Sequence, residues 1–160
     1  MEQYPDYEEL LKLLNENKVE YLVIGGYAVS FHSSPLFTED IDIWINNTKR
    51  NAKKAFKALK KFGIGNIPLK EHELTSDDMV LQIGYKPVRI DVLTGISGIK
   101  FSEAYKRKET GKFFNVKNVN YISYDDLITA KTKAGREKDI IGLGWLKRHR
   151  KKEKKKKNNE

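Results

Sequence analysis

The stretch Tyr21–Ile45 reads YLVIGGYAVSFHSSPLFTEDIDIWI and decides the fold that the sequence predicts. Residues 19–24 are mostly apolar and rich in β-branched side chains, and they end abruptly at Gly25-Gly26, so they predict a strand that stops at a tight turn. The short apolar segment 27–34 predicts a helix of two turns. A second apolar run, ending at Ile45, then predicts a neighbouring strand.

Two aspartates share one face of that second strand. Asp40 and Asp42 alternate with isoleucines in the segment DIDIWI. Side chains at i and i+2 of a strand point to the same side, roughly 6–7 Å apart. Carboxylates held so close repel each other unless a cation or a proton intervenes, which favours a hard divalent metal, Mg²⁺ or Mn²⁺. The alternative is a solvent-facing strand edge, although aspartate is poorly suited to a strand between isoleucines and a tryptophan.

The Gly25-Gly26 turn is a candidate phosphate site. A strand, two glycines and a helix start can direct free backbone N–H groups and the positive end of the helix dipole at a phosphate. A glycine pair can equally be only a tight turn, so the pattern gains its weight from the carboxylates on the next strand.

A third acid, Asp91, interrupts the apolar strand VRIDVL at residues 88–93. A charged carboxylate buried there without a partner costs several kcal/mol. A metal shared with Asp40 and Asp42 would supply the partner. The alternative is an ion pair with Arg89 or with a lysine.

The remaining segments predict helices and strands around this centre. Pro5 and Thr48 each mark the start of an amphipathic helix, and Gly135 marks a bend between two helices. The expected helices are 6–17, 49–63, 101–110 and the bent region 124–149, and the expected strands are 79–84, 88–93 and 112–122.

Composition indicates one domain, residues 1–146, with a modest core. The chain has 160 residues, 39% of them hydrophobic, and no cysteine, so it has neither disulfides nor thiolate metal ligands. The first residues, MEQYPDYEEL, are unlike a secretory signal, and no apolar run approaches the roughly 20 residues of a membrane span. We therefore expect a cytoplasmic protein without membrane contact.

The formal charge of +9 lies mostly at one end of the chain. Residues 147–160 hold nine Lys/Arg and two Glu, a net +7, which leaves +2 for residues 1–146. This composition predicts a basic, disordered tail. The tail could attract nucleic acid, or it could be a solvated terminus that aids solubility.

The joint pattern of Gly25-Gly26, TEDIDIWI at 38–45 and the acid in VRIDVLTGISGIKF at 88–101 resembles the nucleotidyltransferase superfamily to which DNA polymerase beta belongs. That family has Gly-Gly or Gly-Ser after an apolar residue, then Asp-x-Asp on a strand and a third acid on a neighbouring strand. The resemblance is closest to a small single-domain branch related to the nucleotidyltransferase toxins of bacterial abortive-infection systems, in which ISYDDLITAKTKAGREKDIIGL has a counterpart. It covers roughly residues 18–146.

The resemblance implies an α+β fold, a mixed sheet flanked by helices, with a metal-dependent activity. A nucleoside monophosphate would pass from an NTP such as ATP to a hydroxyl of RNA (tRNA, for example), of a protein or of a small molecule. Asp40, Asp42 and Asp91 would hold two Mg²⁺ (or Mn²⁺) ions, and Asp91 could also receive the hydroxyl proton.

The resemblance also implies where the nucleotide binds. Gly25 and Gly26, with Thr38, would face its phosphates. Lys131 and Lys138 match basic positions of the family's LIxxK and GRxKD segments. A phosphate contact by Lys131 and a surface or ion-pair role for it are all open, and Arg136 could bridge to Asp139 or to an adjacent acid within the helix.

One position departs from the family pattern. Many relatives read HGxxRAT before the Asp-x-Asp, whereas here the span His32–Thr38 has Leu36 at the arginine position. Its loss either shifts phosphate binding to a lysine or changes how the nucleotide binds. The alternative function is a catalytically degenerate module that binds RNA or a partner protein. A homodimer or an antitoxin-like partner is compatible with either function.

Overall fold

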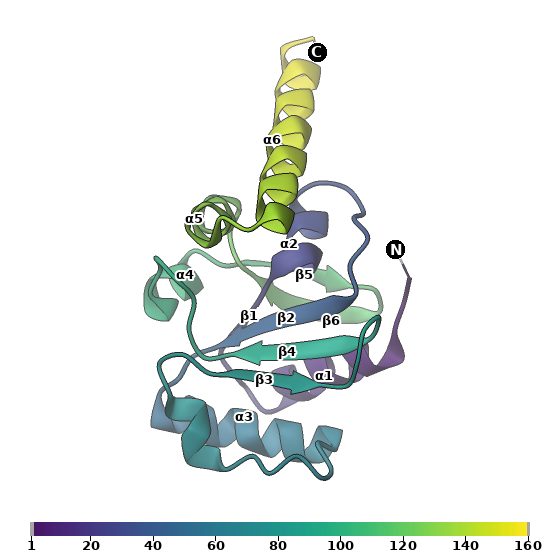
Figure 1. Cartoon of the computed structure of the whole chain (residues 1–160). Coiled ribbons are helices and arrows are strands. Elements are labelled where there is room, and N and C mark those ends of the chain that lie inside the picture. The colour runs from purple at the N-terminus through teal and green to yellow at the C-terminus, as the bar shows by residue number, and fades with distance from the viewer. Residues whose placement is uncertain (1, 160) are drawn as a thin grey trace.

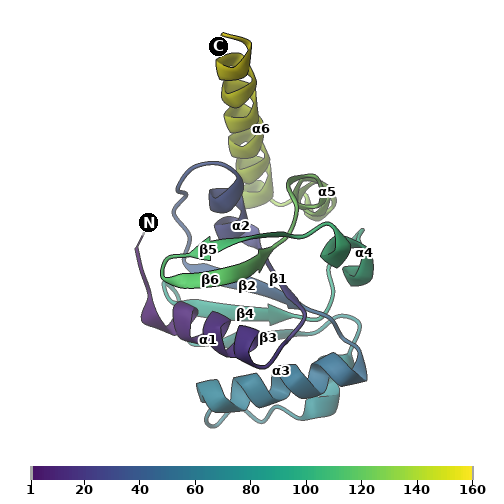
Figure 2. The same cartoon turned by 180° about the vertical axis from the view of Figure 1, so that it is seen from behind.

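A mixed sheet of six strands forms the centre of the protein, with helices on both faces (Figures 1 and 2). The structure is a computed structural model that describes residues 2–159. Its helices are α1 (Pro5–Glu16), α2 (Gly25–His32), α3 (Lys49–Phe62), the 3₁₀ helix η1 (Glu71–Thr75), α4 (Phe101–Lys106), α5 (Tyr124–Ala134) and α6 (Glu137–Asn158). Its strands are β1 (Tyr21–Ile24), β2 (Asp40–Ile45), β3 (Val80–Ile83), β4 (Arg89–Leu93), β5 (Glu109–Phe113) and β6 (Val116–Tyr121).

The strand order β3-β4-β2-β1-β6-β5 places β2 inside the sheet. β2 runs antiparallel to β1 and parallel to β4, and its Asp42 lies in register with Asp91. β1 is also parallel to β6, so the sheet mixes both pairings. The expected α+β fold with a mixed, helix-flanked sheet is therefore confirmed.

The two faces of the sheet bury two separate cores. Ile41, Ile43 and Ile45 of β2 belong to the core under α1 and α3, whereas Trp44 belongs to the core under α2, α4, α5 and α6. Successive strand residues point to opposite faces. Asp40 and Asp42 therefore lie on the same face as Trp44, toward α2, α5 and α6.

Capping residues mark the beginnings and ends of helices where the sequence predicts them. Thr48 accepts a hydrogen bond from the backbone N–H of Asn51, and Gly63 closes α3 in the left-handed conformation, with φ +98°. Gly135, also left-handed, separates α5 from α6. The predicted bend of the C-terminal helical region is confirmed.

The prediction of one strand over residues 112–122 is wrong. This segment turns at Phe114-Asn115, so that β5 and β6 form an antiparallel hairpin. Phe114 takes a positive φ of 50° there, a conformation unusual for a bulky residue. The preceding helix ends at Lys106 because residues 109–113 are used as the first strand.

The basic segment differs from the disordered tail that its composition predicts. Residues 147–158 continue α6, which projects away from the sheet (yellow in Figure 1). Lysine and glutamate are good helix formers, and the turns packed through Leu146 provide a nucleus that the rest extends. Glu160 lies outside the described residues, and a domain boundary at residue 146 stays a prediction.

None of the helices between residues 2 and 159 combines the length and the apolar character that crossing a bilayer requires.

Candidate active site

Three carboxylates from two adjacent parallel strands converge on one face of the sheet. β2 supplies Asp40 and Asp42, and β4 supplies Asp91. One carboxylate oxygen from each lies within 4.8 Å of the others, and Asp40 and Asp91 are buried. The structure thus brings together all three acids that the sequence singles out.

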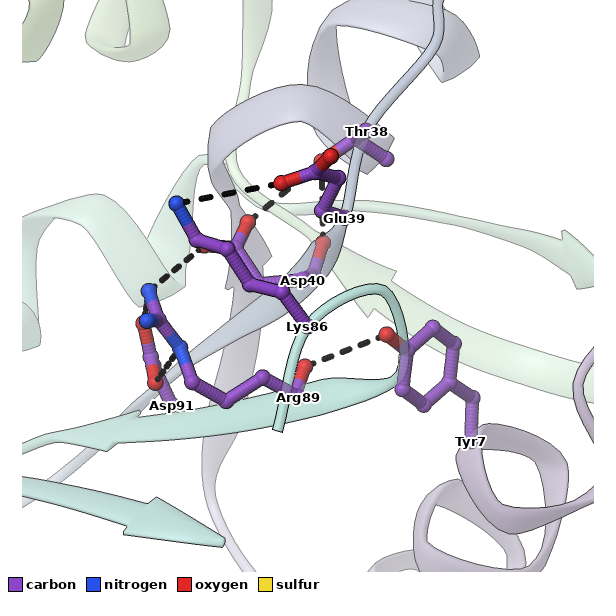
Figure 3. Close-up of polar contacts among 7 residues, drawn as sticks. All are labelled: Tyr7, Thr38, Glu39, Asp40, Lys86, Arg89 and Asp91. Carbon is purple, nitrogen blue, oxygen red and sulfur yellow. Dashed lines mark hydrogen bonds and ion pairs between the residues drawn. The ribbon is translucent and has the colours of Figure 1, made fainter. Parts of the chain in front are cut away.

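An arginine bridges two of these carboxylates (Figure 3). Nη2 of Arg89 lies 2.9 Å from Oδ2 of Asp40 and 3.0 Å from Oδ2 of Asp91, and Nε lies 3.0 Å from Oδ1 of Asp91. The ion pair with Arg89 that the sequence left open for Asp91 is therefore present. Tyr7 donates a hydrogen bond of 3.1 Å to the backbone oxygen of Arg89.

The carboxylates retain capacity for a metal ion in spite of this arginine. Oδ1 of Asp91 is buried and accepts no hydrogen bond, because Nε of Arg89 is close but poorly aligned. Among the described residues, Asp42 has no cationic partner in an ion pair. Clustered carboxylate oxygens are the donors that Mg²⁺ and Mn²⁺ prefer. The residues present therefore fit a divalent cation.

Among the three acids, Asp42 has a pKa that is raised by its surroundings. Burial, followed by the charges of Asp40 and Asp91, raises its pKa to about 7, while Lys138 acts in the opposite direction. A cation at the cluster would oppose this shift, because it favours the charged form of all three acids.

Both glycines of the Gly-Gly turn are required by close packing. Gly25 begins α2 with φ +68°, and a Cβ there would run into the carboxylate of Asp42. A Cβ at Gly26 would lie 2.9 Å from Oγ1 of Thr38. Thr38 in turn donates a hydrogen bond of 3.0 Å to the backbone oxygen of Asp40. The start of α2 is thus held directly against the acidic strand.

Two cavities meet at the carboxylates. The first, of about 270 Å³, lies at the Gly-Gly start of α2, and we call it the cationic cavity after its four basic side chains, although it is also lined by four acids. The basic side chains are Lys86, Lys131, Arg136 and Lys138, and the acids are Glu39, Asp40, Asp42 and Asp139. The second, of about 330 Å³, includes Asp91 and an apolar wall with Ile96 and Leu127, and it shares Lys131, Arg136 and Lys138 with the first. Asp42 lines both cavities. Asp42 therefore stands where the basic side chains of the first cavity meet the apolar wall of the second.

Lys131 lies in the wall of the cationic cavity, in an ion pair. Its Nζ is 3.4 Å from Oδ1 of Asp139, and both side chains are buried. Burial lowers the pKa of Lys131, although Asp139 opposes this shift. Burial alone would raise the pKa of Asp139, but the hydrogen bond from Arg136 and the charge of Lys131 outweigh it, so that pKa is lowered. The ion-pair alternative for Lys131 and the Arg136–Asp139 bridge, at 2.7 Å, are both present.

Leu36, which replaces the family arginine, also lines the cationic cavity. It packs against the core that contains Trp44 and offers no charge to a phosphate. The sequence indicates Arg89 only as a possible ion-pair partner of Asp91, and it does not place Lys86 at the site. For Arg89 a signal was available, because it stands two residues before Asp91 on a strand and must share its face.

Three acids on neighbouring parallel strands, facing a Gly-Gly helix start in a mixed sheet, define a nucleotidyltransferase-type site. The family model described as "Nucleotidyl transferase of unknown function (DUF2204)" matches residues 3–159, so the chain belongs to this family of nucleotidyl transferases.

A solved structure shares the fold. A crystal structure of a "putative nucleotidyltransferase" from Thermotoga maritima superimposes with a TM-score of 0.57 at 14% sequence identity, covering 89% of this chain and 91% of that one. No curated protein matches the sequence. At this identity the likeness to the Thermotoga protein supports the fold alone.

Proposed function

We propose that the protein transfers a nucleoside monophosphate from an NTP such as ATP to a hydroxyl acceptor, with two Mg²⁺ or Mn²⁺ ions held by Asp40, Asp42 and Asp91. The observation that carries the proposal is the position of these acids. Their oxygens lie within 4.8 Å of one another, and Asp42 lines both the cationic and the partly apolar cavity.

Its basic side chains make the first cavity suitable for binding the triphosphate. The backbone N–H groups at Gly25 and Gly26 and the ammonium groups of Lys131 and Lys138 offer donors and positive charge there. Lys131 would share its ammonium between Asp139 and the phosphate, whereas exposed Lys138 can reach the phosphate by moving its side chain alone.

In-line displacement then places the acceptor on the opposite side of the α-phosphorus, in the second cavity. The acceptor oxygen forms a bond to phosphorus, and the bond to the leaving pyrophosphate breaks. Asp91, which lines that cavity, accepts the hydroxyl proton. The divalent ions, when bound, neutralise the charge on the pyrophosphate and lower the pKa of the hydroxyl.

The basic outer part of α6 favours RNA as the acceptor. The first turn of α6 carries Lys138 and Asp139 into the cationic cavity, and the same helix continues outward with nine basic residues between 147 and 157. This outer part has no apolar side chain that could insert into a membrane, and lysines around a helix suit a phosphate backbone. A tRNA end is one such acceptor. A homodimer and an antitoxin-like partner stay predictions.

Nucleotide binding and transfer by matched variants test the proposal. We expect calorimetry to show NTP binding that requires Mn²⁺ or Mg²⁺, and intact-mass analysis of an RNA acceptor to show addition of a nucleoside monophosphate. Asp42→Asn should abolish transfer, whereas Asp125→Asn, the same change at an exposed position in the first turn of α5, should not. Absence of NTP binding at millimolar concentration with either metal would overturn the proposal.

A further inference from the structure

Arg89 occupies a place among the carboxylates that a metal ion would need. Its guanidinium contacts Asp40 and Asp91 at 2.9–3.0 Å, and its single positive charge is shared between these two of the three acids (Figure 3). A guanidinium and a divalent cation cannot both use the same carboxylate oxygens at full strength, because each oxygen has few lone pairs and the two cations repel each other. The arginine and the metal are therefore in competition.

The sheet holds the backbone of Arg89 in place, whereas its side chain is partly exposed. The residue pairs with Asp40 in the β2–β4 register, its N–H donates to the backbone oxygen of Glu39 at 3.3 Å, and its own oxygen accepts from Tyr7. The side chain is 22% exposed and lines the second cavity. The guanidinium can therefore leave the carboxylates by rotation about side-chain bonds, without any change in the strand.

We propose that Arg89 is an exchangeable cation of the active site, which holds Asp40 and Asp91 together until a divalent ion replaces it and which then binds a phosphate of the substrate. A partly buried guanidinium that loses both carboxylates needs a new anion. The phosphate positioned at the carboxylates is the nearest one, a step that rests on the proposed function. Arg89 then supplies, from β4, the positive charge that Leu36 does not.

A Mn²⁺ titration without nucleotide, followed by electron paramagnetic resonance, tests the exchange independently of activity. Arg89→Gln removes the competing charge, so we expect Mn²⁺ to bind on the order of 10- to 100-fold more tightly than in the wild type, the range that one or two charged hydrogen bonds represent. Arg89→Lys keeps a charge but loses the planar fork, so its Mn²⁺ affinity should fall between the two.

A matched control removes an equivalent arginine elsewhere. Arg107 makes a two-bond ion pair with Asp126 at 2.9 and 3.0 Å, away from the three acids. Arg107→Gln should leave Mn²⁺ affinity within about twofold of the wild type, since distant sites act independently. Mn²⁺ affinity in Arg89→Gln that is equal to or weaker than wild type would overturn the exchange. If Arg89→Gln does not fold without metal, Arg89→Lys is titrated in its place, and a Mn²⁺ affinity equal to or weaker than wild type would then overturn the exchange.

Nucleotide affinity at saturating Mn²⁺ tests the second half of the proposal. Arg89→Gln should bind NTP about tenfold more weakly than wild type, although it binds the metal more tightly. Unchanged NTP affinity in this variant would overturn the phosphate role. A wild-type protein that binds Mn²⁺ but no NTP would instead contradict the proposed function, while the metal titration would still decide the exchange.

Discussion

Asp42 on β2 lies directly opposite Asp91 on β4, so the acidic site is built into the pairing of two parallel strands. The same register pairs Asp40 with Arg89. A slip of one residue would turn Asp91 toward the core under α1 and α3, because side chains alternate between the faces. The position of the three acids is therefore as well determined as the sheet itself.

Gly25→Ala should cost more stability than a left-handed glycine normally does. Gly65 has a comparable φ of +57° but open space around its Cα, so Gly65→Ala measures backbone strain alone, about 1 kcal/mol. Gly25→Ala adds contact with the Asp42 carboxylate, and we expect a total loss of about 3 kcal/mol in urea unfolding. Equal costs at the two positions would show that Gly25 is needed only for its backbone conformation.

Metal binding should release a proton below neutral pH. The pKa of Asp42 is about 7 in the folded, metal-free protein, above its ordinary value of 3.8. Asp42 therefore lowers the stability of the metal-free protein as pH rises from about 4 to 7, because over this range the folded state still holds a proton that the unfolded state has already lost. A divalent ion needs the carboxylate.

Calorimetry of Mn²⁺ binding in buffers of different ionisation enthalpy measures that proton. We expect release of up to about one proton per site at pH 6 and almost none at pH 8, with Mn²⁺ affinity rising up to about pH 7. Asp42→Asn should abolish the proton release. Equal proton release at both pH values would contradict the assignment to Asp42.

Asp139→Asn should destabilise the protein far more than Arg136→Gln. The first change leaves the buried ammonium of Lys131 without its carboxylate, which costs about 3–5 kcal/mol. The second removes a side-chain hydrogen bond to the buried Asp139, which keeps Lys131 and the backbone N–H of residue 136 as partners, so its cost should be about 1–2 kcal/mol. Urea unfolding at pH 7 measures both, and similar values would mean that Lys131 is solvated rather than buried.

RNA binding should depend on the outer part of α6. A variant in which four lysines of that segment are neutralised should bind RNA more weakly. Its plot of log K against log salt should also become less steep by about 3, because each lost contact with a single-strand phosphate reduces the steepness by about 0.7. The substitutions are Lys154→Gln, Lys155→Gln, Lys156→Gln and Lys157→Gln.

The matched control neutralises four exposed lysines of α3, which covers the opposite face of the sheet. The substitutions are Lys49→Gln, Lys53→Gln, Lys57→Gln and Lys61→Gln. RNA affinity and salt slope should then stay close to wild type, as measured by fluorescence anisotropy. An equal effect of the two sets would mean that RNA responds only to net charge.

Most of the fold and the acidic half of the site could be predicted from the sequence, because both follow from short-range patterns. Alternation in DIDIWI assigns Asp40 and Asp42 to one face, and the apolar run around Asp91 predicts a neighbouring strand. The β5–β6 hairpin was missed because its turn at Phe114-Asn115 lacks glycine. Composition alone did not predict a helix over residues 147–158, since an isolated basic segment has no packed nucleus to extend.

The cationic half of the site could not be predicted in detail because it depends on long-range packing. Lys131, Arg136 and Asp139 are near one another in sequence, but only the fold buries Lys131 and Asp139 together. Arg89 could be placed on the correct face from its spacing to Asp91, whereas its reach across to Asp40 requires the β2–β4 register.

Helix α6 is continuous from the cationic cavity to its exposed outer end. Its inner end carries Lys138 in the wall of the cationic cavity, and its outer end stands clear of the body near Asn158 (Figure 2). Twenty residues of unbroken helix span about 30 Å. A macromolecule bound at the outer end would therefore be joined to the cavity wall by one continuous helix before its reactive group reaches the acids.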